Sequence, residues 1–446
     1  MIVAMSTPTK QLAPHHNLWS LLTGSVFVLN ALIFLFQAFT KNLFPPLLMP
    51  LRQAFLIDNA QAGLLVTLVF FGYALARFPS GIMADYFSCT KTVLIGSAAM
   101  ALSFLGVALS PYYSVMALMT FILGISSGIY VTAGYTLAVI IGSRKRAATA
   151  TAAFESFGII AGIASPALVT VFVLFLNWQL LFVFCGVLLA AVTFVFFRYR
   201  GRAVDFEIDY AGQNGNSGQA DQKPPWLKEG SGRTFNNFIR EVISSAVIFR
   251  DPMIRRFIIW STLVGGLGAL SWTGINSFIP TFLVEERNYS YDLANRMFII
   301  VAVAGLVAKI AIGSLADRFG NNPVLFSNLV LSIGLFIALP LSFGHWQLMA
   351  ILALLGAACL NTNTLINSYV LRNMPPRYQG AGFGLFCTAY TVVYSLGPYL
   401  TGFLSELFGL SRAIQLSSAG AVVAALLILT ANIFVPRHLV TRLASN

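Results

Sequence analysis

Two basic residues lie inside long apolar stretches of this sequence, where a charged side chain is costly. Arg77 stands in "GYALARFPSGIMADYF", eight residues before Asp85, and Lys309 stands 232 positions after Arg77. Placing such a cation in hydrocarbon costs roughly 2.5 kcal/mol or more. Two cations at matching depth would attract a carboxylate, nitrate or phosphate strongly, so we interpret them as an anion clamp. The alternative is that each cation pairs with protein groups and holds helices together.

Glu155, in "TAAFESFG", is the one acid that lies clearly inside an apolar stretch. It follows Arg146 by nine residues, about 13 Å of helix, which places it near the depth of Lys309. A carboxyl group in such a position can bind and release a coupling proton. A static Glu155–Lys309 ion pair is the alternative. The two roles are compatible, because an ion pair that a proton or a substrate breaks is itself a coupling device.

Further polar and aromatic side chains on these stretches would complete a cavity around the clamp. Each of them either hydrogen-bonds a ligand or joins two helices, and we favour Asn363 or Asn367 as ligand contacts. The bulk and the hydroxyl groups of Tyr390 and Tyr394 suit an organic anion. The candidates for substrate binding besides the two cations are Asn30, Gln37, Tyr73, Tyr130, Tyr135, Trp272, Asn276, Asn361, Asn363, Asn367, Tyr390 and Tyr394.

The elements that must position these residues are membrane-spanning helices. Hydrophobic residues make up 57% of the 446-residue chain and charged residues 9%, whereas soluble chains carry about 25% charged residues. Each apolar block is long enough to cross about 30 Å of hydrocarbon as a helix. We therefore expect an all-α membrane protein with twelve transmembrane helices, near 18–39, 60–80, 92–109, 115–141, 149–174, 178–197, 257–283, 293–315, 323–343, 347–371, 379–404 and 413–434.

The basic residues fall mostly on one side of these helices. With both termini in the cytoplasm, 20 of the 27 Lys and Arg residues are cytoplasmic, and the outer side holds Lys41, Arg52, Arg287, Arg296 and Arg412. This asymmetry follows the positive-inside rule, and it explains the net charge of +12 without a nucleic-acid partner. We expect a monomer in the lipid bilayer of a bacterial inner membrane.

The chain divides into two related halves. The pairs Gly81 and Gly313, Asp85 and Asp317, Gly124 and Gly356, and Pro166 and Pro398 are all 232 positions apart. A constant spacing across separate regions indicates a duplicated six-helix unit. We expect tails at 1–17 and 435–446, and six-helix bundles at 18–200 and 257–434. The linker at 201–256 should be mostly disordered up to residue 235, with a short amphipathic helix after it.

Several motifs resemble those of the major facilitator superfamily. "GIMADYFSCTK" and "GSLADRFGNNP" are similar to its loop signature, and "NWQLLF", "FIPTFLVEE" and "PPRYQGAGFGLF" are similar to its sixth, seventh and eleventh spans. The resemblance implies two bundles that expose a central site alternately to each side of the membrane. In the signatures, we expect Asp85 and Asp317 to gate by capping a neighbouring helix N-terminus. Arg318 follows the second aspartate but Tyr86 follows the first, so the two gates should be unequal.

Within this superfamily, the paired cations resemble those of nitrate/nitrite porters. The Gly-rich fifth and eleventh spans of those porters are missing here, so the likeness supports an anion rather than nitrate. We interpret the chain as a secondary active transporter that moves a small organic anion by proton-coupled uptake or exchange. The alternative is proton-driven efflux of a drug or siderophore, although Gly124 stands where drug antiporters carry Arg and "GIIAGIASP" departs from their G-x-x-x-G-P motif.

Other classes of function find less support in the sequence. A transporter-like sensor or scaffold would need a folded cytoplasmic domain, and residues 201–256 are short and polar. The sequence has no nucleophile–base pair, metal-ligand cluster or phosphate-binding loop, so we expect neither an enzyme nor a cofactor. The cysteines have no metal-ligand spacing, and we interpret them as packing residues: Cys89, Cys185, Cys359 and Cys387.

Overall fold

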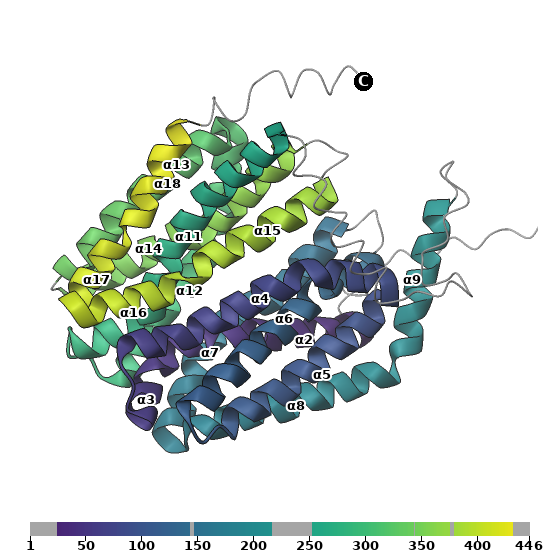
Figure 1. Cartoon of the computed structure of the whole chain (residues 1–446), viewed down its shortest axis with the longest axis horizontal. Coiled ribbons are helices and arrows are strands. Elements are labelled where there is room, and N and C mark those ends of the chain that lie inside the picture. The colour runs from purple at the N-terminus through teal and green to yellow at the C-terminus, as the bar shows by residue number, and fades with distance from the viewer. Residues whose placement is uncertain (1–24, 143–146, 216–251, 343, 375–378, 431–446) are drawn as a thin grey trace, which may run out of the picture.

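The computed structural model describes residues 25–142, 147–215, 252–342, 344–374 and 379–430, and within these ranges the chain is almost entirely helical. Two groups of helices pack side by side (Figure 1). We call residues 25–215 the N half and residues 252–430 the C half.

The N half contains eight helices among the residues described: α2 (Ser25–Asn42), α3 (Phe44–Phe55), α4 (Asn59–Phe87), α5 (Cys89–Ala108), α6 (Tyr113–Gly142), α7 (Ala147–Phe175), α8 (Trp178–Arg198) and α9 (Arg200–Gly215). The described part of the C half contains α11 (Pro252–Glu285), α12 (Tyr291–Phe319), α13 (Asn321–Ala338), the 3-10 helix η4 (Leu339–Leu341), α14 (His345–Asn373), α15 (Gln379–Ser395), α16 (Gly397–Phe408), α17 (Leu410–Ser417) and α18 (Ala419–Leu429).

Helix boundaries repeat between the two halves. In the N half, α4, α5, α6, α7 and α8 begin at Asn59, Cys89, Tyr113, Ala147 and Trp178. In the C half, α12, α13, α14, α15 and α17 begin at Tyr291, Asn321, His345, Gln379 and Leu410. Each of these helices begins 232 residues after its counterpart. The structure thus confirms the duplicated six-helix unit.

Eleven of the described helices are long and apolar enough to cross a membrane, and the remaining expected span, at 379–404, is broken into α15 and α16. The break follows from Pro398, which has no N–H group to donate to the carbonyl of Tyr394. The hydroxyl of Thr273 on α11 donates to that carbonyl instead, at 2.8 Å. The kink therefore leaves the carbonyl satisfied, and the twelve-span architecture holds.

Glycines allow the helices of each half to approach closely, as is usual where membrane helices pack. A Cβ atom at Gly124 on α6 would overlap the backbone oxygen of Val69 on α4. A Cβ atom at Gly356 on α14 would overlap the backbone oxygen of Val301 on α12. The two halves therefore repeat the same close contact at equivalent positions.

This contact predicts that Gly356→Ala destabilises the protein and that Gly313→Ala does not. The added methyl group at residue 356 must push α12 and α14 apart, and such overpacking costs about 1–3 kcal/mol. A methyl group at residue 313 would meet nothing within 4 Å, and alanine is the better helix former. We expect a lower unfolding temperature in detergent for Gly356→Ala alone. Equal unfolding temperatures for the two variants would contradict the close packing.

The start of the linker is helical, which corrects the disorder expected from residue 201 onward. Helix α9 places the side chain of Glu207 in a buried position with 3% exposure. Its carboxylate accepts hydrogen bonds from the N–H groups of Cys89 and Thr90, at 3.2 and 2.8 Å, and from the Thr90 hydroxyl. The first N–H groups of a helix have no partner within it, so Glu207 caps α5 from a distant part of the chain.

The amphipathic helix expected at 236–256 lies mostly outside the described residues. Its last five residues, 252–256, are the beginning of α11. The first transmembrane helix of the C half therefore begins earlier than the expected boundary at residue 257.

The two halves are bonded to each other at the end of the molecule where α3 lies, which we call the α3 end; α9 lies at the opposite end (Figure 1). Arg52 Nη1 lies 2.6 Å from Glu285 Oε1. The hydroxyl of Tyr291 donates to the carbonyl of Pro46 at 2.7 Å.

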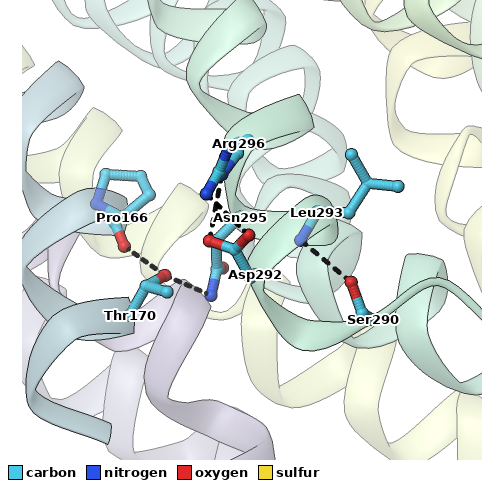
Figure 2. A network of polar contacts seen from close by, with 7 residues as sticks. All are labelled: Pro166, Thr170, Ser290, Asp292, Leu293, Asn295 and Arg296. Atoms are coloured by element: carbon cyan, nitrogen blue, oxygen red, sulfur yellow. Dashed lines mark hydrogen bonds and ion pairs between the residues drawn. The ribbon is translucent and has the colours of Figure 1, made fainter. Parts of the chain in front are cut away.

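A further link joins α7 and α12 near the same end (Figure 2). The amide of Asn295 donates to the hydroxyl of Thr170 at 3.0 Å, and this hydroxyl donates to the carbonyl of Pro166 at 2.8 Å. Asn295 is 1% exposed, so the bond lies in the packed contact between the halves. Together these bonds hold the halves closed at the α3 end.

Candidate functional site

A cavity of about 730 Å³ lies between the two halves. Helices α2, α4, α6 and α7 of the N half line it, together with α14 and α15 of the C half. Its polar and charged lining consists of Gln37, Lys41, Tyr73, Arg77, Thr132, Tyr135, Thr136, Glu155, Asn367 and Cys387. Five phenylalanine and aliphatic side chains line it as well: Phe34, Phe78, Ile82, Val131 and Phe383.

Two cations share one tyrosine ring in this cavity. Nζ of Lys41 lies 3.3 Å from the ring centroid of Tyr73, and Cζ of Arg77 lies 5.7 Å from the same centroid. The quadrupole of an aromatic ring attracts a cation over its face. Within the described part of the chain, neither cation forms an ion pair with a carboxylate. The site therefore carries two positive charges that no described acid neutralises.

The place of Lys41 corrects its assignment to the outer side. Lys41 lies in α2, and after Leu43 the chain continues as α3, which begins at Phe44. Pro45 and Pro46 stand in the first turn of α3, where their missing N–H groups have no intrahelical partner to lose. The chain thus stays helical beyond Lys41, through the twelve residues of α3. The apolar letters "LFPPLLMPL" after it are the sequence signal for this extension.

A smaller cavity of about 380 Å³ adjoins the first, and the two share Phe34, Tyr135 and Glu155 in their walls. Nζ of Lys309 on α12 lies 3.0 Å from Oε2 of Glu155 on α7. The hydroxyl of Tyr135 donates to Oε1 of Glu155 at 3.4 Å. The Lys309 and Glu155 side chains keep 40% and 36% of their exposure, so this ion pair faces the cavity.

Arg77 and Lys309 do not line a common cavity, which corrects the clamp expected from sequence. Arg77 lines the larger cavity and Lys309 lines the smaller one. The physical reason is that Lys309 meets a carboxylate on the helix opposite, which already neutralises its charge. The cation that lies beside Arg77 is Lys41.

Several expected binding residues do line the two cavities. Gln37, Tyr73 and Asn367 line the larger one, and Asn276 and Asn361 line the smaller one. Oδ1 of Asn367 is buried without a hydrogen-bond partner among the described residues. An unsatisfied buried oxygen costs free energy, so this amide is available to a ligand. Cys387, for which the sequence predicts a packing role, also lines the larger cavity.

Other expected binding residues line neither cavity and have structural partners instead. Asn30 donates to the carbonyl of Gly134 at 2.9 Å and accepts from the Tyr130 hydroxyl at 3.1 Å, which joins α2 to α6. Trp272 is packed in the core with 6% exposure. These three residues were expected in the cavity because the polarity of a residue does not reveal whether the protein itself satisfies it.

The two tyrosines on α15 form an aromatic column rather than a cavity wall. The ring centroids of Tyr390 and Tyr394 lie 4.9 Å apart. The hydroxyl of Tyr390 donates to Oδ1 of Asn363, which therefore has a protein partner. None of these three residues lines either cavity.

The structure does not show the capping role expected of Asp317. Asp317 Oδ1 lies 2.6 Å from Arg372 Nη2, and both side chains are exposed. The helix α13 that follows has Gly320 as its N-cap and no side-chain cap. Arg318 is exposed, with its guanidinium carbon 5.3 Å from the ring centroid of Phe319. The side chain of Asp85 lies outside what the structure describes.

Among the described residues, no three His, Cys, Asp or Glu side chains gather into a group that could hold a metal ion. Any ligand of the site would therefore meet cations, hydroxyl groups, an amide and aromatic rings. The cations of this set can bind an anion.

Comparison with known sequences gives the following matches. The sequence model of the Major Facilitator Superfamily matches residues 29–398 and 262–445. Over 149 residues, the chain is 29% identical to the multidrug resistance protein MdtG of Proteus mirabilis, an alignment that covers 32% of this chain and 37% of that protein. Over 135 residues, it is 26% identical to the benzoate transport protein of Acinetobacter baylyi, covering 30% of this chain and 28% of that protein. The chain thus aligns with well under half the length of these relatives.

Comparison with solved structures extends over nearly the whole chain. A crystal structure of a mutant of the nucleoside transporter NupG superposes with a TM-score of 0.69 at 17% sequence identity. The superposition covers 91% of this chain and 98% of that one. At such low identity, the likeness concerns the fold.

Proposed function

We propose, from the premise that this chain belongs to the major facilitator superfamily and is a multi-pass membrane transporter rather than an enzyme, that it moves a small organic anion by alternating access. The observation that carries this proposal is the pair Lys41 and Arg77 on the ring of Tyr73, in a cavity built by both halves. An anion that enters between the halves neutralises charges that no described carboxylate neutralises.

The chemistry of the cavity favours an organic cargo over a small inorganic one. Arginine can hold a carboxylate through two parallel hydrogen bonds, and lysine adds a compact positive charge. The rings of Phe34, Phe78 and Phe383 offer apolar contact to the body of the ligand. A volume of about 730 Å³ lies in the range of small-molecule sites, about 300–1,000 Å³.

The proposed coupling ion is a proton carried by Glu155. Protonation of Glu155 would remove its attraction to Lys309, and the two residues belong to different halves. Because Glu155 lines both cavities, a change in its charge is felt at the site of the anion. This arrangement supports uptake or exchange in which proton and anion move together.

The relatives named above are consistent with two kinds of cargo. The likeness to a benzoate transport protein supports an organic anion, and the likeness to a multidrug resistance protein supports efflux of a drug. The two cations without a described counter-charge favour the first, because a cationic drug would be repelled from them. Efflux of an anionic or neutral compound stays the second candidate.

A thermal-shift screen of the purified transporter tests the proposed cargo. The panel contains benzoate, aliphatic carboxylates, nitrate and the organic cation benzylammonium. A ligand that binds only the folded state raises its stability by about 2.7 kcal/mol at a concentration of 100 Kd. We expect organic anions to raise the unfolding temperature and benzylammonium to leave it unchanged. Stabilisation by the cation alone would contradict the proposal and would favour drug efflux.

The proposed orientation places the α3 end at the outer side of the membrane and α9 in the cytoplasm. Because the halves are bonded at the α3 end, the conformation would then be closed to the outside. Gly81 on α4 and Gly384 on α15 extend the lining of the larger cavity toward the end of the molecule where α9 lies. This extension is consistent with access from the cytoplasm.

This orientation predicts which introduced cysteines react in intact cells. Cysteines at Gly215 and Ser445 should resist a membrane-impermeant thiol reagent, and a cysteine at Asn288, exposed in the loop between α11 and α12, should react. All four native cysteines are buried, so their background labelling should be low. Labelling at residue 215 from outside would reverse the proposed topology.

A further inference from the structure

The constant spacing of 232 residues relates the two contacts that α4 and α12 make with the opposite half. It maps Arg77 on α4 to Lys309 on α12, and Glu155 on α7 to Cys387 on α15. The contact between α12 and α7 contains the Lys309–Glu155 ion pair, 3.0 Å long. The corresponding contact between α4 and α15 contains Arg77 and Cys387. The position of the carboxylate is thus occupied by a thiol.

The packing of α4 against α15 supports this correspondence directly. The two helices run antiparallel, and the ring centroids of Phe70 and Tyr394 lie 5.5 Å apart across their contact. Seven residues further along α4 is Arg77, and seven residues back along α15 is Cys387. Both residues line the same cavity of about 730 Å³. Residue 387 therefore lies level with Arg77, just as Glu155 lies level with Lys309 in the other contact.

We propose that residue 387 determines how strongly the central cavity favours anions. A buried thiol is uncharged near neutral pH, so Cys387 leaves Arg77 without a fixed counter-ion. The anionic substrate then takes the place that a carboxylate occupies in the other contact. An aspartate at residue 387 would neutralise Arg77 and leave Lys41 as the second cation of the site, so anions would bind more weakly. This inference rests on the proposed function and names the residue that sets its specificity.

The first arm of the test measures the interaction of residue 387 with Arg77 and needs no ligand. Cys387→Asp and its uncharged control Cys387→Asn are made in the native chain and in the Arg77→Gln variant. With Arg77 present, we expect the aspartate to give a higher unfolding temperature than the asparagine. In the Arg77→Gln background, we expect this order to reverse, because the aspartate is then a buried charge without a partner. An order that does not depend on Arg77 would overturn the inference.

The second arm measures cargo, with benzoate as the probe, in the same thermal-shift assay. We expect benzoate to stabilise the native protein and Cys387→Asn, and its apparent affinity for Cys387→Asp to fall by about tenfold or more. Equal stabilisation of all three proteins would overturn the inference and leave the proposed function standing. If neither benzoate nor any other anion of the screen stabilises the native protein, the proposed function fails. The role of residue 387 in anion specificity then fails as well, even if the first arm shows an interaction with Arg77.

Discussion

We expect Arg77→Gln to weaken binding of the proposed anion by at least about 30-fold, and Lys41→Gln to do the same. Each substitution removes one of the two positive charges that lie on the ring of Tyr73. Truncating one partner of a desolvated charge pair costs about 2–5 kcal/mol, which corresponds to a roughly 30-fold to 5,000-fold loss of affinity. Isothermal titration of the purified variants with the anion found in the thermal-shift screen measures this loss.

The matched control for both variants is Lys91→Gln, which removes an exposed cation from α5, a helix that lines neither cavity. It should bind the anion with native affinity. Arg77→Lys should weaken binding as well if the guanidinium holds a carboxylate through two hydrogen bonds. Native affinity in both Arg77→Gln and Lys41→Gln would refute the site. Failure of both variants to fold would instead assign the two cations a structural role.

We expect Glu155→Gln to lose pH-driven accumulation of the substrate and to retain exchange across the membrane. The glutamine keeps the shape of the side chain but can neither lose nor gain the coupling proton. In proteoliposomes, we expect the variant to exchange external for internal substrate and to gain nothing from an imposed pH gradient. Normal accumulation by Glu155→Gln would show that another group carries the proton or that transport is not coupled to protons.

The ion pair itself is tested by a double-mutant cycle of Glu155→Gln and Lys309→Met. Breaking a fully buried pair costs about 3–5 kcal/mol, and exposed pairs contribute about 1 kcal/mol or less. The pair keeps 40% and 36% of its exposure toward the cavity, so we expect each single variant to lose between about 1 and about 3 kcal/mol of unfolding free energy. The double variant should recover much of this loss. Additive losses would mean that the two side chains do not stabilise each other.

The overall architecture could be predicted from the sequence for two reasons. Membrane-spanning helices are recognisable as long apolar blocks, and the second half of the chain repeats the residue pattern of the first. Pairs of residues such as Gly124 and Gly356 predicted the duplication, and the helix starts repeat with the same spacing. The prediction that Glu155 and Lys309 lie at a similar depth agrees with their ion pair. It could be made because the number of residues along a helix gives the distance along its axis.

The parts that could not be predicted depend on how side chains are partnered across helices. A charge such as Lys41 usually marks the end of a span, and the apolar letters alone do not reveal that the helix α3 follows directly, with Pro45 and Pro46 in its first turn. Asn30 is as polar as a ligand contact, but the hydroxyl of Tyr130 satisfies it within the N half. A sequence shows which groups need a partner at a given depth, whereas only the packing shows which of them already have one.

The bonds at the α3 end have a consequence for the sidedness of transport. Arg52–Glu285, Tyr291–Pro46 and Asn295–Thr170 must all separate before a substrate can enter from that end. When a binding-competent conformation is rarely populated, the apparent Kd equals the intrinsic Kd divided by its population. The same binding site would therefore half-saturate at a higher substrate concentration from the α3 face than from the α9 face. Two membrane faces with one shared site would in this way sense different ranges of concentration.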